Sequence, residues 1–436
     1  MSSPILSTAR AAPADGTLLA VALGVGLLLR LGALALVGDV THGATLWEYG
    51  EQAVCAFHTH GDLCGFYDGG LATYPSAYMP PLLSYFWLLL FHLFGDGAVA
   101  RAAWLTASLA VALVNIWLVF RLSLSLGRSG MEAFFAAGLL AVYPTFVFVT
   151  ATYHQTNWAV FFLLVIVATA VRIAQSERMS WRDAALSGLF CGLATLNRSE
   201  MLLVGPALVA LSALWRRKFT DLIRIGLVAG CAMALVLAPW VTRNYILFGE
   251  VIPAAQSGGY NLWKGFNPYT NGSGNMTEEP PTGPGAQARG RIQASVAHGP
   301  LYETRLQAAF MQAFEADVDA ASGRRLAQLA LDKVALLWVF DWTDVRITGS
   351  LAYRLPWLIA NLLVVLGLVV LWRDRRHVDK PTAVICSGAL ASLTVVYAAS
   401  AVHARYRMHL EPILFIAAGV GAQALLSQLA RRFRPL

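Results

Sequence analysis

The chain has 436 residues, of which 57% are hydrophobic and only 13% are charged, and its mean hydropathy is +0.58. A soluble domain carries about 25% charged residues, so these properties exclude an ordinary water-soluble protein and favour a bilayer as the solvent. The net charge of +7 does not indicate nucleic-acid binding, because Lys and Arg form short clusters between apolar runs, as topology signals do. The composition predicts an all-α integral membrane protein.

A bilayer-spanning helix needs about 20 mostly apolar residues. The first run, Leu18 to Val37, shows no signal-peptide cleavage site, so we expect it to be a retained span. We treat residues 1–430 as a single transmembrane domain and 431–436 as a basic cytoplasmic tail. In chain order, about ten runs are predicted to span: 18–38, 98–120, 132–150, 156–173, 183–197, 200–215, 222–242, 354–372, 382–402 and 409–430.

The basic clusters predict the orientation of these helices. They follow the second, fourth, sixth, eighth and tenth runs, so all five lie on one side if the chain starts inside and alternates. The positive-inside rule makes that side cytoplasmic. Both termini are then cytoplasmic, and two large segments, about 39–97 and 243–350, face outside.

One apolar segment, Tyr78 to Phe94, does not fit this alternation. Counting it as a span would reverse every later helix and move the basic clusters to opposite sides. The segment opens with Pro80 and Pro81, which suit a helix start because the missing N–H groups are not needed there. We therefore predict a re-entrant or interface-lying helix.

Two cysteines lie together in the first outer segment. Cys55 and Cys64 could form a disulfide if this segment faces an oxidising compartment, and two free thiols are the alternative. The other three cysteines lie inside apolar runs and are expected to be packing residues.

Acidic residues at the outer end of the first span are candidates for catalysis. Glu48 and Glu51 are three residues apart and would share one face of a helix, where they could meet an acceptor group or a metal. An ordinary solvated helix is the alternative. Arg30 lies inside the first span, where it would face a polar cavity, contact a lipid headgroup or snorkel to the interface.

Cationic and aromatic residues gather in the remaining outer segments. Guanidinium and ammonium groups there would suit a lipid phosphate, whereas simple interfacial anchoring is the alternative reading. The candidates for substrate binding are Arg30, Tyr78, Arg243, Tyr260, Lys264, His403, Arg405 and Arg407.

Several blocks together resemble the polytopic GT-C glycosyltransferases that use lipid-phosphate sugar donors, in the branch of the protein O-mannosyltransferases and the lipid A aminoarabinose transferases. The resemblance covers roughly residues 18–430, without the C-terminal soluble domain of some relatives. The blocks are Trp47 to Ala53 with Tyr78 to Leu83, Gly188 to Glu200, Pro239 to Tyr245 with Gly259 to Trp263, and Arg405 to Arg407 with Pro412.

The resemblance implies transfer of a sugar from a polyprenyl-phosphate donor to an acceptor on the non-cytoplasmic face. It implies that Glu48, or less directly Glu51, is the base that deprotonates the acceptor. The leaving lipid phosphate needs cations, and the basic outer residues match by location. The implied localisation is a multi-pass protein of the bacterial cytoplasmic membrane, with its site facing the periplasm or exterior.

Two departures from the family pattern concern the acidic residues. The family more often shows Asp-Glu where this chain has Trp47 and Glu48, and the stretch Thr152 to Asn157 lacks the second carboxylate that often follows the third span. His154 could replace it as a metal ligand or proton carrier. A divalent metal therefore stays an open expectation.

Two other functions remain as alternatives. A transporter or flippase would concentrate polar residues at the membrane midplane, which here is nearly bare apart from Arg30. A non-catalytic envelope subunit would be expected to lose the first-loop carboxylates. The sequence does not specify the sugar, the acceptor (a glycan, a lipid or a protein) or the oligomeric state.

Overall fold

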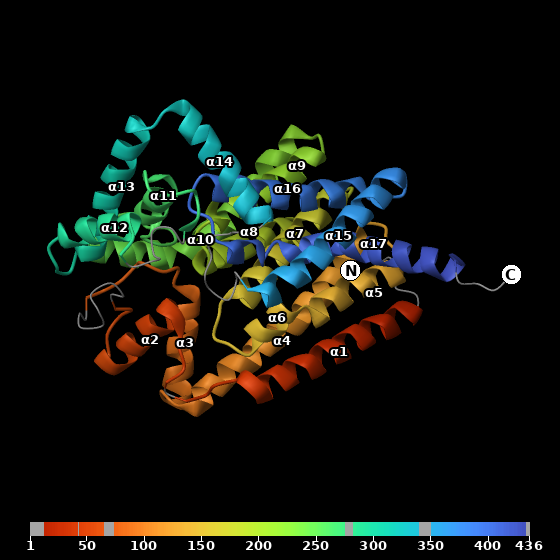
Figure 1. Ribbon diagram of the computed structural model, residues 1–436, viewed down its shortest axis with the longest axis horizontal. Helices are drawn as coiled ribbons and strands as arrows, with labels where there is room; N and C mark the ends of the chain where they lie inside the picture. The colour runs from red at the N-terminus through yellow and green to blue at the C-terminus, as the bar shows by residue number, and fades with distance from the viewer. Residues whose placement is uncertain (1–12, 42, 65–73, 275–281, 340–349, 433–436) are drawn as a thin grey trace.

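The computed structural model describes residues 13–41, 43–64, 74–274, 282–339 and 350–432 as an all-α protein (Figure 1). Long helices lie roughly along the long axis, with the chain's C-terminus at one end and helices α2, α3 and α11 to α13 at the other. No β-strand occurs in the described ranges, apart from two isolated bridges. The predicted fold class is confirmed.

Each of the ten predicted spans is a helix, with α5 and α6 sharing one run. The bundle helices are α1 (Pro13–Val37), α4 (Ala98–Ser125), α5 (Gly130–Val142), α6 (Pro144–Thr150), α7 (Thr156–Gln175), α8 (Trp181–Asn197), α9 (Met201–Trp215), α10 (Phe219–Phe248), α15 (Leu351–Arg373), α16 (Lys380–Ala398) and α17 (Glu411–Arg432).

Seven of these helices are long and apolar enough to cross a membrane, or eight if α5 and α6, which are bent by 54°, form one broken span. The difference from ten lies in α8 and α9, which have 17 and 15 residues. At 1.5 Å per residue they rise roughly 25 Å, less than the hydrocarbon thickness of about 30 Å. The turn that joins them therefore stops short of the far surface.

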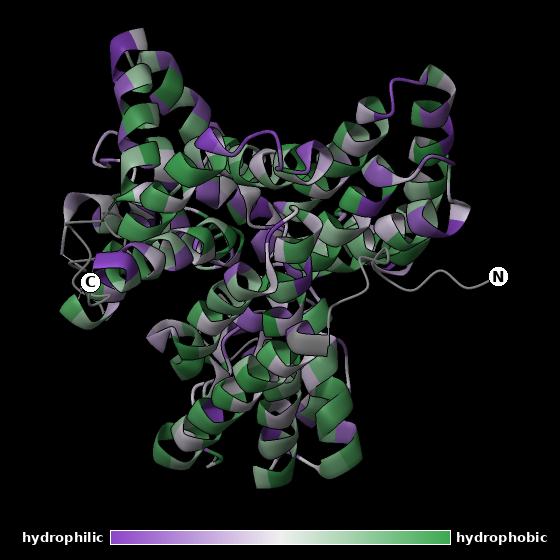
Figure 2. Cartoon of the chain, turned by 90° about the vertical axis from the view of Figure 1, so that its right-hand side faces the viewer, coloured by the Kyte–Doolittle hydropathy of each residue, from purple (hydrophilic) through white to green (hydrophobic). Residues whose placement is uncertain are grey.

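Many residues of the long helices are hydrophobic, as their green colour in Figure 2 shows. Leu28, Leu235 and Leu362 are 71%, 76% and 72% exposed, which only an apolar solvent would tolerate on this scale. Together with the spans, this confirms an integral, multi-pass membrane protein.

The basic clusters do gather at one end of the bundle. Arg128, after α4, lies 3.2 Å from Asp374, after α15, and Arg216, after α9, donates to the carbonyl oxygen of Ser176, after α7. These contacts join four loops that the sequence assigned to one side. We call this side the inner end and the opposite side the outer end.

The bend between α5 and α6 explains Arg30. Pro144 has no N–H, so the carbonyl of Leu140 loses its helical partner, and the break leaves the carbonyl of Ala141 free as well. Arg30 fills both: its guanidinium donates to Ala141 at 2.8 Å and to Leu140 at 3.2 Å. The residue is 1% exposed and acts as an internal cap.

Short helices build the outer end. They are α2 (Trp47–Thr59), α3 (Leu82–Phe94), α11 (Gly258–Phe266), α12 (Pro284–Ala294), α13 (Tyr302–Ala320), α14 (Gly323–Trp338) and the 3₁₀ helix η3 (Ala404–Arg407).

Helix α3 is the ambiguous segment of the sequence, and its 13 residues are too few to span. It starts directly after Pro81, as predicted. Trp87 of α3 stacks on Trp104 of α4 with ring centroids 4.5 Å apart, and Tyr49 of α2 packs on the other side of Trp104 at 6.2 Å. This aromatic core holds α2, and with it Glu48, against the outer end of the bundle.

Candidate functional site

A largely buried polar cluster lies at the turn between the short helices α8 and α9. Arg198 and Glu200, in the turn between these helices, form an ion pair. The hydroxyl of Tyr397, near the end of α16, donates to Glu200 Oε1 at 2.7 Å, and lies 2.7 Å from Nε2 of His409. A phenol has one proton, so His409 must donate from Nε2 to the Tyr397 oxygen.

Burial and the ion pair fix the charges in this cluster. Burial alone would raise the pKa of Glu200, but Arg198, His409 and the Tyr397 hydroxyl outweigh it and lower that pKa to about 2. Burial, reinforced by Arg198, lowers the pKa of His409 to about 3. At neutral pH the cluster thus contains a carboxylate, a guanidinium and a neutral imidazole.

The charges of Glu48 and Arg405 both act on Tyr49, the neighbour of Glu48 in α2. Burial raises the pKa of the Tyr49 hydroxyl well above its usual value; the charge of Glu48 raises it further, while Arg405 and Arg198 lower it. The charges of Glu48, Arg405 and Arg198 therefore all act on the hydroxyl of Tyr49. Glu48 and Arg405 are both half-buried, and neither side chain forms a hydrogen bond or ion pair with the described residues. A carboxylate and a guanidinium without protein partners are available to a ligand.

His154 lies at the same place. Its ring meets the edge of Trp47 at 5.0 Å, and Nδ1 lies 2.7 Å from the Thr156 hydroxyl. Burial, with Arg405 and Arg198 adding to it, lowers the pKa of His154 to about 3, so the ring is neutral at physiological pH. The described residues place no three His, Cys, Asp or Glu side chains together, so their geometry gives the expected metal no ligand set.

Glu51 points elsewhere on α2. It is exposed, and the charges that act on it are Arg101 and Asp96, which pair with each other at 3.0 Å. The spacing of three residues did predict a shared helix, but of the two carboxylates only Glu48 acts on Tyr49 together with Arg405 and Arg198.

A second group of predicted residues lines the approach from α11. Lys264 Nζ lies 3.0 Å from His403 Nε2, and both side chains are buried. Tyr260 packs beneath Lys264, whose ammonium is 5.3 Å from the ring centroid. His403 in turn contacts Tyr406, which stacks on Tyr397 at 5.0 Å. These residues are thus continuous with the cluster of Arg198 and Glu200.

Arg243 and Tyr78 belong to the support of the outer loop. Arg243 pairs with Asp62 at 2.7 Å and donates to the Ser76 carbonyl oxygen at 2.9 Å. The backbone N–H of Tyr78 donates to the Ser76 hydroxyl oxygen, which also accepts from Gln52 at 2.7 Å. The Arg243 side chain and the Tyr78 backbone therefore hold the loop to α2 and α10, and the role of the Tyr78 side chain in substrate binding stays a prediction.

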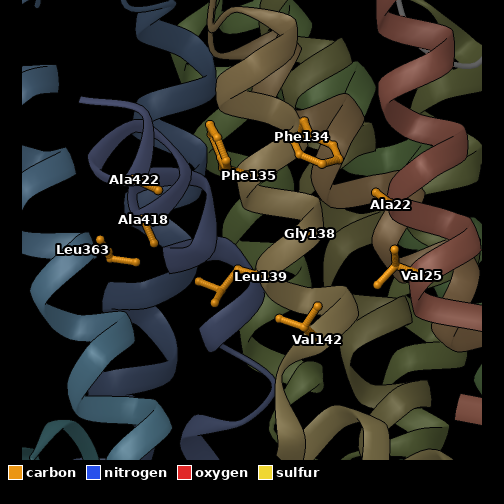
Figure 3. Close-up of a pocket in the computed structure, with 10 residues that line it drawn as sticks. All are labelled: Ala22, Val25, Phe134, Phe135, Gly138, Leu139, Val142, Leu363, Ala418 and Ala422. Carbon is orange, nitrogen blue, oxygen red and sulfur yellow. The ribbon is translucent and has the colours of Figure 1, made fainter. Parts of the chain in front are cut away.

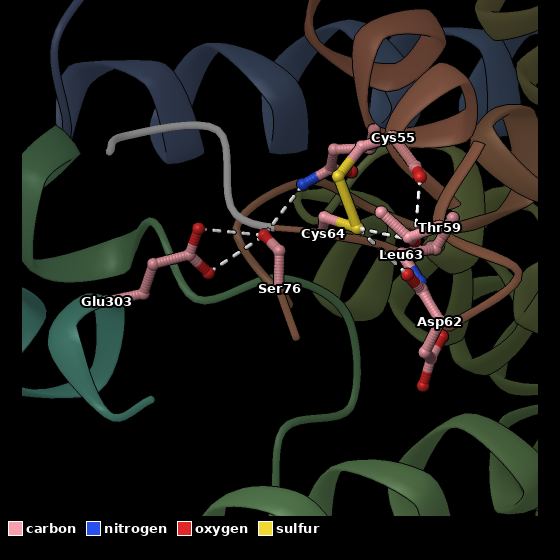
Figure 4. The surroundings of a disulfide bond; sticks show 8 residues. Cys55, Thr59, Asp62, Leu63, Cys64, Ser76 and Glu303 are labelled. Carbon is pink, nitrogen blue, oxygen red and sulfur yellow. Dashed lines mark hydrogen bonds between the residues drawn. A yellow bond between two sulfur atoms is a disulfide. The ribbon is translucent and has the colours of Figure 1, made fainter. Parts of the chain in front are cut away.

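Figure 4 shows how the loop is fastened. Cys55 and Cys64 form the disulfide that the sequence left open, and the Ser76 hydroxyl donates to buried Glu303 of α13. Glu303 also accepts from the backbone N–H of Ala77 at 3.2 Å. The disulfide and this carboxylate hold residues on either side of 65–73, which lie outside the described ranges.

Arg407 is the clearest departure from the predicted phosphate ligands. It pairs with Glu411 at 2.9 Å, both side chains are fully buried, and its guanidinium donates to the carbonyl oxygens of Leu337 and Val339. It also lies over the Trp357 ring at 3.9 Å. Like Arg30, it joins helices, because the end of α14 supplies carbonyl groups to which its guanidinium donates.

Sequence reasoning missed Arg198, Glu200 and Tyr397 as members of the cluster. In the sequence, Asn197 to Glu200 belongs to one of the blocks that carry the family resemblance, and its residues are equally compatible with a tight turn between two helices. The available signal was the unusual shortness of the two flanking apolar runs, which places a charged turn inside the membrane region.

Part of the chain is similar to known proteins in sequence. Residues 78–242 match the family described as dolichyl-phosphate-mannose-protein mannosyltransferase. A stretch of 58 residues is 45% identical to undecaprenyl phosphate-alpha-4-amino-4-deoxy-L-arabinose arabinosyl transferase 1 of Pseudomonas fluorescens, covering 13% of this chain and 10% of that protein. The resemblance seen in the sequence is confirmed.

Solved structures support the fold over nearly the whole chain. The oligosaccharyltransferase AglB of Archaeoglobus fulgidus, in complex with an inhibitory peptide and a dolichol-phosphate, matches with a TM-score of 0.55 at 13% identity, over 96% of this chain and 51% of that one. Its form tethered to an acceptor peptide matches with a TM-score of 0.56 at 13% identity, over 96% and 50%. The chain thus spans about half the length of these structural relatives and a tenth of the curated one.

Proposed function

We propose that the protein is a glycosyltransferase that moves a sugar from a polyprenyl-phosphate donor to an acceptor on the non-cytoplasmic face of a bacterial cytoplasmic membrane. The observation that carries the proposal is the pair Glu48 and Arg405, a half-buried carboxylate and guanidinium that both act on Tyr49 and whose side chains have no partners among the described residues. The family match and the relatives described above support the reaction class.

The chemistry follows from these two groups. An acceptor oxygen or nitrogen attacks the anomeric carbon as the bond from that carbon to the phosphate oxygen breaks, and the acceptor proton passes to Glu48. The lipid phosphate leaves with its charge facing Arg405, and Lys264 and His403 lie along the approach from α11. A single displacement of this kind inverts the anomeric configuration.

The cluster behind these groups positions them. Arg198 is neutralised by Glu200, so its role is to hold Tyr397 and Tyr406 in place rather than to bind phosphate. His154 is neutral and bonded to Thr156, and its ring contacts Trp47, the neighbour of the proposed base. We assign it a positioning role.

The transporter reading predicts polar residues along the whole membrane path. In the structure, the Arg30 guanidinium is hydrogen-bonded to carbonyl groups at the α5–α6 break, so this polar residue of the midplane has a structural role. We therefore favour transfer over transport.

Purified protein in proteoliposomes, offered a panel of radiolabelled polyprenyl-phosphate sugars, tests the proposal. We expect label to move from at least one donor to an acceptor or to water with the wild type, and not with Glu48→Gln. The Glu315→Gln protein, in which the same change is made at an exposed site on α13, serves as the matched control. Movement of intact solute across the membrane without a glycosyl product would overturn the proposal in favour of transport.

A further inference from the structure

A large groove lies at the inner end, away from the proposed transfer site. It has a volume of about 780 Å³, within the range of ligand sites, and separates α16 from the packed pair α15 and α17. Its walls are apolar: Leu368 and Leu371 come from α15, Val384 and Leu390 from α16, and Ile413 from α17. A hydrocarbon chain fits such walls.

Three cations line the same groove at the connection between α15 and α16. They are Arg375, Arg376 and Lys380, all exposed. Among the described residues none of the three forms an ion pair. The nearby carboxylates are already engaged: Asp374 bonds to Arg128 and His377, and Asp379 caps α16 through Thr382.

Two tryptophans indicate how deep in the membrane the three cations lie. Trp215 and Trp372 line the groove, and Trp372 is 69% exposed. Tryptophan prefers the level of the lipid headgroups, so the three cations stand at the headgroups of the inner leaflet. An apolar groove with unpaired cations at headgroup depth matches an amphiphile with an anionic head.

A second groove lacks the cations that line the first one. It has a volume of about 360 Å³ and lies between α1, α5, α15 and α17 (Figure 3). Its lining, which includes Phe134, Phe135 and Leu363, is entirely apolar and has no cation at its edge. Such a groove can accept any hydrocarbon chain but cannot select a headgroup.

We propose that the groove bordered by Arg375, Arg376 and Lys380 is a binding site for an anionic diacyl phospholipid of the inner leaflet, with an acyl chain between α15 and α16 and the phosphate on the three cations. The site is separate from the transfer reaction and does not depend on it. The bound lipid would fill the space between α16 and the packed pair α15 and α17.

Native mass spectrometry of delipidated protein tests this site. Dioleoyl-phosphatidylglycerol and dioleoyl-phosphatidylcholine are titrated in turn, and we expect the anionic lipid to bind at least about tenfold more tightly. A cation near an anionic group contributes about fivefold, so the triple variant R375A/R376A/K380A should lose most of that preference. The matched variant K218A/R224A/R431A removes three exposed inner-end charges outside the groove and should keep it.

Two cavity-filling variants test the occupant independently of charge. Ser387→Leu narrows the α16 wall and should weaken phosphatidylglycerol binding by at least about tenfold. Gly138→Leu fills the groove of Figure 3, where an added Cβ meets no atom within 4 Å, and should leave binding unchanged.

Three outcomes would overturn the proposal. The first is equal binding of the two phospholipids by the wild type, which needs no variant to fold. The second is equal loss in both triple variants, which would show general attraction to surface charge. The third is tight binding of undecaprenyl phosphate with none of phosphatidylglycerol, which would assign the groove to another lipid.

Discussion

At the inner end of the bundle, arginines are bonded to carboxylates and carbonyl groups of neighbouring loops, whereas at the outer end the side chains of Glu48 and Arg405 have no partners among the described residues. Arg172 pairs with Asp183 at 2.6 Å and Arg216 with Asp221 at 2.8 Å, both at the inner end. Glu48 and Arg405 have no such bonds within the described ranges. Charges that fix topology and packing are satisfied internally, and charges available to a ligand are not.

At the outer end the same comparison separates Arg407, which is paired, from Arg405, which is not. Substitution of Arg407 is expected to have the largest effect on stability. Because both partners of the Arg407–Glu411 pair are fully buried, Arg407→Ala leaves an uncompensated carboxylate and should lower the unfolding free energy by about 3–5 kcal/mol. Thermal unfolding in detergent measures this. The double variant Arg407→Met with Glu411→Leu should recover most of the loss; an unchanged melting temperature for Arg407→Ala would contradict the assigned packing role.

Arg405→Ala should leave stability nearly intact and reduce kcat/KM for the lipid-phosphate donor by about 10²–10³-fold, because a preorganised cation facing the leaving group is removed. Steady-state transfer assays measure this. Arg324→Ala, at an exposed position of α14, is the control. If both variants behaved alike, Arg405 would be an ordinary interfacial cation.

The sequence predicted those parts of the fold and of the candidate site that depend on local properties. Helices, their order, the common side of the basic clusters and the short α3 followed from apolar run lengths and charge positions, which are local properties. Glu48 and Arg405 were named because their types and positions suit the chemistry. The cap role of Arg30 was not predictable, because it depends on carbonyl groups 110 and 111 residues away.

Arg407 shows the same limit. Its neighbours Arg405 and Tyr406 are half-buried, while Arg407 turns inward to Glu411. Adjacent residues of a 3₁₀ turn point in different directions, and which one faces a recess depends on long-range packing. Similarly, nothing local in the sequence indicated that Glu303 of α13 would secure Ser76.

The outer cluster should also make stability depend on pH. The pKa values of His154 and His409 are lowered from 6.5 to about 3 in the folded protein, so below pH 6.5 the unfolded chain binds protons that the folded chain does not. Stability should therefore fall as the pH drops from 6.5 toward 3. Glu200, lowered from 4.5 to about 2, adds a further loss below pH 4.5.

Melting temperatures measured from pH 7.5 to 4.5 test this. His409→Gln, which keeps a donor to Tyr397 but does not titrate, should flatten the profile above pH 4.5 relative to the wild type. If the melting temperature of His409→Gln fell as steeply with pH as that of the wild type, groups other than His409 would cause the pH dependence.

At the inner end the expected effects are smaller. Arg128→Ala removes a bond to half-exposed Asp374 and one to the His377 carbonyl oxygen, and should cost about 1–2 kcal/mol of stability without changing donor affinity. Arg431→Ala, which is exposed, should stay within about 0.5 kcal/mol of the wild type. Thermal unfolding and donor titration together measure both; a loss of donor affinity in Arg128→Ala would break the division between the two ends.

The most direct test of the proposed base compares two carboxylates of one helix. Glu48→Gln and Glu51→Gln are assayed for single-turnover transfer at saturating donor, with binding of unlabelled polyprenyl phosphate as the check on folding. The account predicts that Glu48→Gln binds the lipid normally and loses about 10²–10⁴-fold in rate, while Glu51→Gln stays within a few-fold of the wild type. Full activity in Glu48→Gln, or the larger loss in Glu51→Gln, would contradict it.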